Sequence, residues 1–171
     1  GEIKVVETCD IPLLVKQEAK RVNIADVISG ETYEVRGAIV QVFNSNLLYE
    51  VCPTCKTKVR KEGNDFVCKT HGKVTHDWLV ILNGVIDDGT SNMKVVFFRD
   101  NALKVMGMTI EHVVANRTEI LNELKILGKE FIFTGTLKKN KLLNKDEFVV
   151  TGIKDVDVKN EITKMMNTLK K

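Results

Sequence analysis

Three cysteines and one histidine fall within one short window of the sequence, in two pairs of equal spacing. Two residues separate Cys52 from Cys55, and after a further twelve residues Cys68 and His71 repeat that separation. Each pair can form a tight turn that directs two donors at one point, and two facing turns complete a tetrahedron. Zn²⁺ prefers thiolate and imidazole donors, and four protein ligands leave no position for water. The spacing therefore predicts a structural zinc site and not a catalytic one.

Other interpretations of these side chains explain less of the pattern. Three ordinary buried thiols would not account for matched spacing at both ends of the window. A redox pair at Cys52 and Cys55 would leave the second half of the motif without a role. His76 is a rival fourth ligand, but the two-residue spacing favours His71. Cys9 lies far away in sequence and is expected to be a small apolar residue on a strand.

The elements that position this motif belong to a chain of ordinary size and composition. Its 171 residues are 43% hydrophobic and 29% charged, which allows a buried core and argues against wholesale disorder. Four cysteines are few for a disulfide scaffold, and a chain of this length can bury a core without one. No run of about 18 apolar residues occurs, so the sequence predicts no membrane-spanning helix.

Apolar and β-branched residues recur in a definite order of strands and helices. The sequence predicts strands over residues 33–42, 47–51, 78–86, 93–98, 130–137 and 147–153, the first two forming one interrupted strand. Gly37 lies inside the first of them and indicates a bulge. Asp100 is expected to cap a short helix that ends at Gly107, and Thr109 to cap a longer one that continues toward Gly128.

Three strands, a helix and two further strands are the order of an OB-fold, a small Greek-key barrel that often binds oligonucleotides. We therefore predict an all-β barrel with helices, a five-stranded OB-fold over residues 22–156. A zinc ribbon at 52–73 is inserted between strands 1 and 2, and a helix lies between strands 3 and 4. A C-terminal helix follows at 157–171, and residues 1–21 are expected to be a linker or the end of a preceding domain.

The net charge of +3 conceals an uneven distribution of charged residues. Residues 52–75 hold six basic side chains against two acidic ones, and residues 131–151 hold four against two. In an OB-fold the loops after the first and fourth strands flank the binding face, so both basic clusters fall beside that face. Lysines on loops are often only solvated, but this joint placement favours contacts with phosphates. The candidates are Lys56, Lys58, Arg60, Lys138, Lys139 and Lys141.

Single-strand binding also needs aromatic faces on which bases can stack. Alternation along the third strand places Phe98 on the same face as Lys94, and a lysine does not belong on the core face. Phe98 is therefore expected to point outward. Trp78 and Tyr49 are further candidates that suit either base stacking or core packing, and Phe43 stays undecided.

Several segments resemble the zinc-containing OB domain of replication protein A, the single-stranded-DNA-binding protein of archaea and eukaryotes. The likeness covers roughly residues 22–171, and it is carried by residues 49–55, 66–68, 78–82, 96–98 and 106–107. His71 departs from the four-cysteine ligand set of the C-terminal DNA-binding domain of the eukaryotic large subunit. A site with three cysteines and one histidine is chemically equivalent for Zn²⁺. The archaeal members are the closer match.

The resemblance implies that the ribbon interrupts the barrel between its first two strands and that Phe98 stacks on a base. It also implies that the C-terminal helix packs against helices of other OB-fold subunits. In the sequence that helix carries one apolar stripe, of Ile162, Met165, Met166 and Leu169, and the simplest alternative is that the stripe docks on the chain's own barrel.

The function expected from the sequence is single-stranded DNA binding in replication, repair and recombination, without enzymatic activity. No nucleophile pattern or phosphate-binding glycine loop occurs, and the metal site is closed. An RNA-binding OB module and an architectural subunit for oligomerisation are the alternatives. The expected location is cytoplasmic and nucleoid-associated in an archaeon, and intracellular in any organism.

Overall fold

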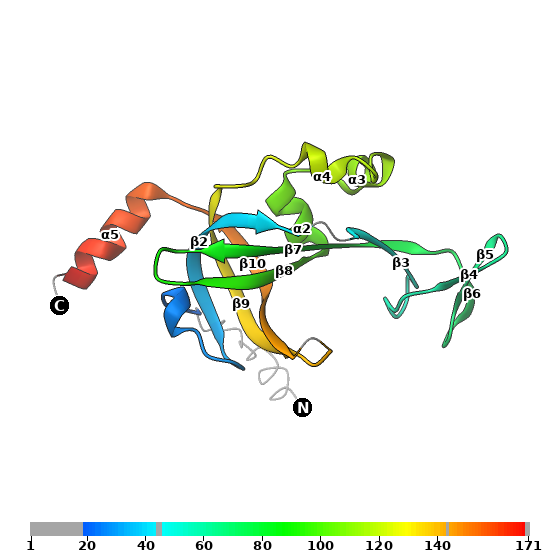
Figure 1. The fold of residues 1–171 in the computed structure, drawn as a ribbon, viewed down its shortest axis with the longest axis horizontal. Coiled ribbons are helices and arrows are strands. Elements are labelled where there is room, and N and C mark those ends of the chain that lie inside the picture. The colour runs from blue at the N-terminus through cyan, green and yellow to red at the C-terminus, as the bar shows by residue number, and fades with distance from the viewer. Residues whose placement is uncertain (1–18, 44–45, 143, 170–171) are drawn as a thin grey trace, which may run out of the picture.

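The computed structural model describes residues 19–43, 46–142 and 144–169. Within these ranges the chain forms a large mixed sheet, a small ribbon of three strands and five helical segments (Figure 1). The strands of the large sheet are β1 (Lys20–Arg21), β2 (Thr32–Val42), β3 (Leu48–Val51), β7 (Asp77–Asp87), β8 (Asn92–Phe98), β9 (Glu130–Asn140) and β10 (Lys145–Asp155). The ribbon strands are β4 (Arg60–Glu62), β5 (Asp65–Cys68) and β6 (Gly72–Val74). The helical segments are η1 (Ile24–Asp26), α2 (Arg99–Met106), α3 (Ile110–Ala115), α4 (Ile120–Glu123) and α5 (Val158–Leu169).

The strands of the large sheet follow the order β1-β2-β9-β10-β8-β7-β3, and β2 also pairs with β7. Hydrogen-bonded pairing therefore runs in a ring through β2, β9, β10, β8 and β7. Within that ring β8 and β10 are parallel, and the other neighbours are antiparallel. The described sheet has seven strands where the sequence predicted five. The difference consists of β1 and the division of the first predicted strand into β2 and β3, which pair with opposite halves of β7.

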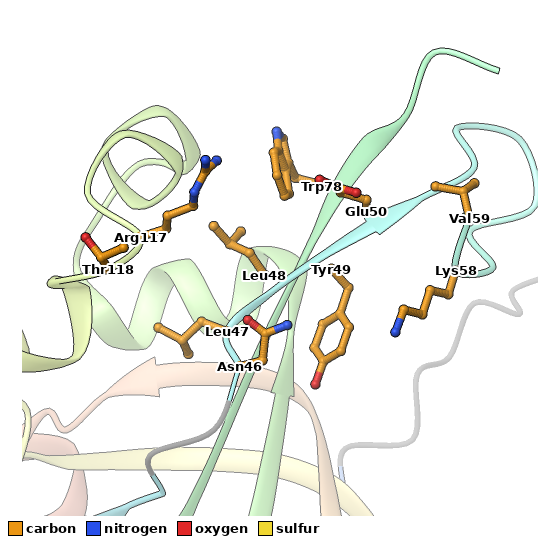
Figure 2. Close-up of a pocket in the computed structure, with 10 residues that line it drawn as sticks. All are labelled: Asn46, Leu47, Leu48, Tyr49, Glu50, Lys58, Val59, Trp78, Arg117 and Thr118. Atoms are coloured by element: carbon orange, nitrogen blue, oxygen red, sulfur yellow. The ribbon is translucent and has the colours of Figure 1, made fainter. Parts of the chain in front are cut away.

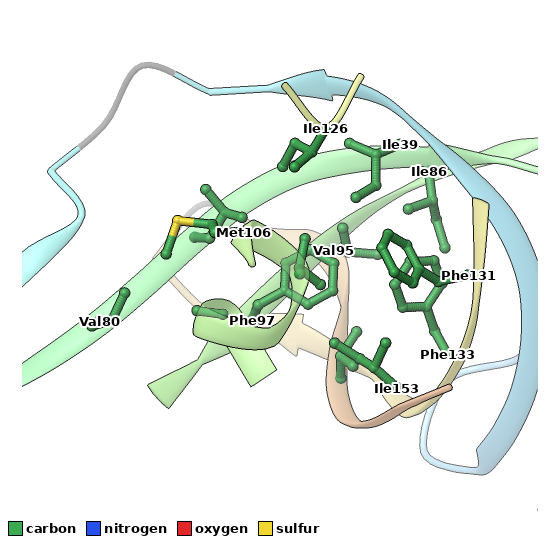
Figure 3. Packing of buried hydrophobic residues seen from close by; sticks show 14 of the residues in the cluster. Ile39, Val80, Ile86, Val95, Phe97, Met106, Ile126, Phe131, Phe133 and Ile153 are labelled. Carbon is green, nitrogen blue, oxygen red and sulfur yellow. The ribbon is translucent and has the colours of Figure 1, made fainter. Parts of the chain in front are cut away.

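Alternating apolar side chains of the ring strands fill its interior (Figure 3). Phe133 lies at the centre of an aromatic group, with ring centroids 5.6 Å from Phe97 and 5.8 Å from Phe131. Phe148 is also fully buried in this core. Cys9, which was expected to lie on a strand, is outside the described residues. Most of the 1–21 segment, expected to be a linker or the end of a preceding domain, is outside them too. The end of that segment, β1, pairs in parallel with β2.

The bulge of β2 does not occur at Gly37. The register against β7 shifts between Ile39 and Gln41 instead. At Gly37 a Cβ would lie 3.4 Å from the backbone oxygen of Asp87, which is an ordinary contact distance. The strands approach even more closely at Gly84, where a Cβ would lie 2.5 Å from the Gln41 oxygen, a distance that side chains do not tolerate.

The segment between β8 and β9 is less regular than the sequence predicted. α2 ends at Gly107, whose φ of 67° is the left-handed conformation that glycine adopts at helix ends. Asp100 lies in the first turn of α2 and does not cap it, whereas the Thr109 hydroxyl accepts a hydrogen bond from the His112 amide and caps α3 as expected. The long helix predicted after Thr109 is wrong. The segment forms two short helices, α3 and α4, and the break between them begins at Asn116, whose side chain donates to the His112 carbonyl oxygen.

The ribbon and α5 lie at opposite ends of the molecule (Figure 1). β7 connects the ring to the ribbon, because its first residues pair with β3 and its later residues pair with β2 and β8. Among the described residues, no helix is both long enough and apolar enough to cross a membrane.

α5 is held to the sheet by charged side chains and not by its apolar stripe. Glu161 is only 4% exposed and lies 2.6 Å from an Arg21 nitrogen, and another Arg21 nitrogen lies 2.6 Å from Glu34. Burial alone would raise the pKa of Glu34, but its hydrogen bond to Arg21 and the charges of Arg21 and Lys154 hold that pKa below its ordinary value. The carboxylate of Glu34 is therefore ionised near neutral pH and contributes to this anchor.

Candidate nucleic-acid interface and metal centre

The four side chains of the predicted metal motif converge in the ribbon. Their donor atoms all lie within 4.8 Å of one another. The Nδ1 atom of His71 is 3.6 Å from the Sγ atoms of both Cys52 and Cys68, and the Sγ atoms of Cys55 and Cys68 are 3.5 Å apart. Zn–S bonds of about 2.3 Å and Zn–N bonds of about 2.0–2.1 Å give a tetrahedron with edges of about 3.5–3.8 Å. The three distances of 3.5–3.6 Å fit the edges of that tetrahedron.

Tight backbone turns hold the donors in place. The Lys56 amide donates to the Cys52 carbonyl oxygen over 2.9 Å, and Lys56 adopts a positive φ of 60° to close the turn. Backbone amides of His71 and Thr70, with the His71 side chain, lower the pKa of Cys68 from 9 to about 5. The fold thus favours the thiolate form of Cys68, which is the form that binds metals.

The rival histidine, His76, is not part of this cluster. Its ring packs between Phe66, with centroids 4.1 Å apart, and Trp78, with centroids 4.9 Å apart. Buried apolar side chains around the cysteines are few, because this second core contains only Cys52, Val59 and Cys68 as fully buried members. So small a core supplies little hydrophobic stabilisation to the ribbon.

One surface of the large sheet collects the predicted aromatic and basic residues. Phe98 is the register partner of Ile81, and Tyr49 is the register partner of Leu79. Register partners share a face, and so do residues two apart along a strand. We call the surface formed by Tyr49, Leu79, Ile81, Lys94 and Phe98 the outer face. Phe98 is 36% exposed there, as the sequence predicted.

Trp78 does not belong to the outer face. It precedes Leu79 on β7, and it is the register partner of Glu50. Strand alternation therefore places it on the other side of the β3–β7 pair, which we call the reverse face and which includes Leu48, Glu50 and Trp78. Figure 2 shows Tyr49 and Trp78 pointing to opposite sides of the two strands. The two aromatic candidates therefore cannot contact the same base.

Lys94 lies between an aromatic ring and a carboxylate on the outer face. Its Nζ atom is 5.8 Å from the centroid of Phe43 and 3.5 Å from a Glu147 oxygen. Lys138 is the register partner of Glu147 and therefore shares this face. Phe43, which the sequence left undecided, thus joins the outer face through its contact with Lys94. Phe43 lies on the outer face because it follows directly after the end of β2, and not because it is a phenylalanine.

The remaining predicted basic residues are distributed over the ribbon and the β9–β10 turn. Lys56 donates to Asp77 over 2.9 Å and holds the pKa of that carboxyl below its ordinary value, and Arg60 lies 3.2 Å from Glu62. Lys58 is exposed beside Tyr49, and both line one cavity (Figure 2). Lys139 and Lys141 are exposed at the β9–β10 turn.

Arg117, in the turn between α3 and α4, is a residue that sequence analysis did not identify. Its guanidinium carbon lies 5.9 Å from the Trp78 ring centroid. No spacing in the sequence connects the two residues, because the α3–α4 break that places Arg117 there was not predicted.

Comparisons with known proteins agree with this architecture. A family model described as the replication factor-A C terminal domain matches residues 32–165. The replication protein A 70 kDa DNA-binding subunit of Tetrahymena thermophila is 26% identical over 153 residues, which are 81% of this chain and 22% of that protein. A probable replication factor A 73 kDa subunit of Caenorhabditis briggsae is 28% identical over 102 residues, which are 57% of this chain and 16% of that protein. The chain therefore spans less than a quarter of the length of these relatives.

Two solved structures share the fold. A replication protein A heterotrimer bound to single-stranded DNA superposes with a TM-score of 0.75 at 19% identity, over 89% of this chain and 40% of that chain. Yeast replication protein A bound to single-stranded DNA gives 0.73 at 19% identity, over 89% of this chain and 97% of that chain. These similarities establish an OB-fold-like mixed sheet. Because the family match extends over most of the sequence, this chain belongs to the replication factor-A C-terminal domain family.

Proposed function

We propose that this chain is a non-enzymatic single-stranded-DNA-binding domain that works in DNA replication, repair and recombination. The observation that carries the proposal is the outer face, where the exposed ring of Phe98 shares a surface with Lys94 and Lys138. Bases stack on an aromatic ring while cations track the phosphates. One relative is named as a DNA-binding subunit, and two structural neighbours are titled as bound to single-stranded DNA, which supports the same conclusion.

The proposed architecture is a five-stranded OB barrel whose first strand consists of β2 and β3, with the ribbon inserted before β7. Cys52, Cys55, Cys68 and His71 would hold a structural Zn²⁺ in that ribbon. The distances among their donor atoms support this assignment. A bound Zn²⁺ would supply cross-linking of the ribbon and no reaction chemistry, because all four positions come from protein.

Salt should weaken the binding of single-stranded DNA steeply. If Lys58, Lys138, Lys139 and Lys141 neutralise four phosphates, log K should fall with log salt at a slope of about −3. Anisotropy titrations of labelled oligo-dT at several salt concentrations measure this slope. Parallel titrations with oligo-rU and with duplex DNA test the substrate class.

Three results of these titrations would contradict the proposal. An affinity that does not change with salt excludes phosphate tracking by these lysines. Tighter binding of oligo-rU than of oligo-dT would instead identify an RNA-binding module, and equal binding of duplex would exclude single-strand selectivity.

We also propose that α5 packs against helices of other OB-fold subunits. Its apolar stripe is unpartnered in the described structure, with Ile162, Met165, Met166 and Leu169 between 51% and 85% exposed. The stripe therefore does not dock on the chain's own sheet. Exposed apolar side chains gathered on one helix face are typical of protein interfaces. The heterotrimer among the structural neighbours supports this role.

Replacing both Ile162 and Met166 with glutamate should abolish association with other subunits and leave the affinity for oligo-dT unchanged. The new charges should change the free energy of unfolding of the free chain little, because both positions are exposed. In an interface the same charges would be buried, which weakens association. Sedimentation of mixtures with the partner subunits measures the association. Lys159→Ala, on the same helix, is the matched control, and unchanged sedimentation of the double variant would refute the proposal.

A further inference from the structure

A cavity of about 520 Å³ lies at the edge of the large sheet, next to β3. β3 is the last strand in the sheet order, so one of its edges has no neighbouring strand of that sheet. The lining includes Tyr49 and Lys58 from one side of β3, and Trp78 and Arg117 from the other (Figure 2). The cavity therefore wraps around the strand edge and connects the outer face to the reverse face.

Trp78, which lines this cavity together with Arg117, is the last ring of an aromatic row that has a cation at each end. Lys61 Nζ lies 5.9 Å from the Phe66 ring centroid, and the guanidinium carbon of Arg117 lies 5.9 Å from that of Trp78. Between them Phe66, His76 and Trp78 form a continuous series of ring contacts, 4.1 Å and 4.9 Å between centroids. The row runs from the ribbon to the α3–α4 turn.

The charge of the cavity favours an anionic occupant. Among its lining residues Lys58 and Arg117 are cations, and Glu50 is the only carboxylate. In the described part of the chain no carboxylate oxygen lies within 4 Å of the Arg117 guanidinium, whereas Lys56 and Arg60 have such partners. The guanidinium is therefore available for a phosphate, and the half-buried Trp78 ring beside it offers a base the part of its surface that faces the cavity.

We propose that this cavity binds an unpaired nucleotide, with its base against Trp78 and its phosphate toward Arg117 and Lys58. The inference rests on the proposed single-strand binding and extends it to a second surface. A strand that crosses the outer face reaches Tyr49 at the edge of β3 and continues around that edge onto the reverse face. The protein thus follows the strand over two sides of one β-strand pair.

Residues 57–59 already pair with Glu50, Val51 and Cys52 on this edge, so a peptide could add a strand only beside Leu48, and such a peptide is the other occupant that the geometry would admit. Such a peptide gains its affinity from backbone hydrogen bonds and needs no cations. The two cations and the aromatic row therefore favour the nucleotide, and the experiment below separates the two.

Trp78 is the only tryptophan of the chain, so intrinsic tryptophan fluorescence reports on the surroundings of this one ring, and Arg117→Ala then tests the cavity that Arg117 lines. One OB-fold covers about 4–16 nucleotides, so oligo-dT of about 4 nucleotides tests the outer face and longer oligo-dT reaches the cavity. We expect longer oligo-dT to quench Trp78 emission and to protect it from acrylamide. Arg117→Ala should weaken binding of longer oligo-dT roughly tenfold and leave binding of the shortest oligonucleotide unchanged.

Lys159→Ala, which removes one positive charge from α5, is the matched control for Arg117→Ala. Anisotropy of a labelled oligonucleotide records binding independently of Trp78. If anisotropy shows binding while Trp78 emission is unchanged and Arg117→Ala behaves as Lys159→Ala, the cavity is not a nucleotide site and the proposed function stands. If no oligonucleotide binds at all, both proposals fail. Quenching by a strand-forming peptide and not by oligo-dT would assign the cavity to peptides and overturn the inference.

Discussion

Serine in place of Cys68 is expected to abolish metal binding and to unfold the ribbon while the large sheet stays folded. Cys68 lies within donor distance of two other ligands, and the ribbon core has only Cys52 and Val59 as its other fully buried members. Structural zinc contributes about 10–16 kcal/mol of apparent binding free energy in small zinc domains, far more than so few apolar side chains. Elemental analysis should find about one equivalent of zinc in the unchanged protein and none in the variant.

A matched substitution separates metal loss from general damage. His71→Cys should keep zinc, because four thiolates also form a closed tetrahedral site. Limited proteolysis should cleave Cys68→Ser within residues 52–74 and leave His71→Cys resistant. Full zinc content in Cys68→Ser would show that the proposed ligand set is wrong. Loss of the sheet's circular dichroism signal in that variant would show that the two cores do not fold independently.

Replacing Phe98 with alanine should weaken binding of short oligo-dT by about 1–3 kcal/mol, roughly 5- to 150-fold. Phe98 is 36% exposed at the end of β8, and its ring is not part of the buried core. Its removal therefore leaves little cavity, and the free energy of unfolding should change by less than about 1 kcal/mol. Anisotropy titration gives the affinity, and urea unfolding checks the stability.

Two further variants test whether stacking, and not apolar burial, explains the loss. Phe98→Tyr retains an aromatic face and should bind nearly as well as the unchanged protein. Phe98→Leu retains apolar area without a π-face and should bind almost as weakly as Phe98→Ala. Equal affinities of the leucine and phenylalanine proteins would exclude base stacking at this position.

The sequence was sufficient where a pattern is local. Alternation located the six predicted strands close to their observed bounds and directed Phe98 outward. The paired spacing of cysteines and histidine brought four donors together. In each case the periodicity of a strand or the length of a turn decides the result, so no knowledge of distant contacts was needed.

It was insufficient where strand register decides the result. Tyr49 and Trp78 were equal candidates in the sequence. They lie on opposite faces because the register between β3 and β7 pairs Tyr49 with Leu79 and not with Trp78. β1 is only two residues long, and its pairing with β2 has no local signal. The division between α3 and α4 falls at Asn116, and although asparagine favours helix ends it also occurs within helices, so its presence alone does not predict a break.

Ion pairing also changed the meaning of the basic clusters. A count of charges does not distinguish Lys58 from Lys56, Arg60 and Lys94. In the structure the first three lie beside carboxylates, of Asp77, Glu62 and Glu147, and Lys58 lies in the cavity next to Tyr49. Asp77 and Glu147 are distant in sequence from Lys56 and Lys94, so only the folded chain reveals these two ion pairs.

The long strand β7 has a mechanical consequence. Its eleven residues span about 36 Å, and one end is clamped in the ring by β2 and β8 while the other carries β3 and the ribbon. In mechanical terms β7 is a cantilever, not a hinge. A force applied to the ribbon, such as tension in a bound strand, therefore bends β7 and with it the part of the sheet that forms the outer face.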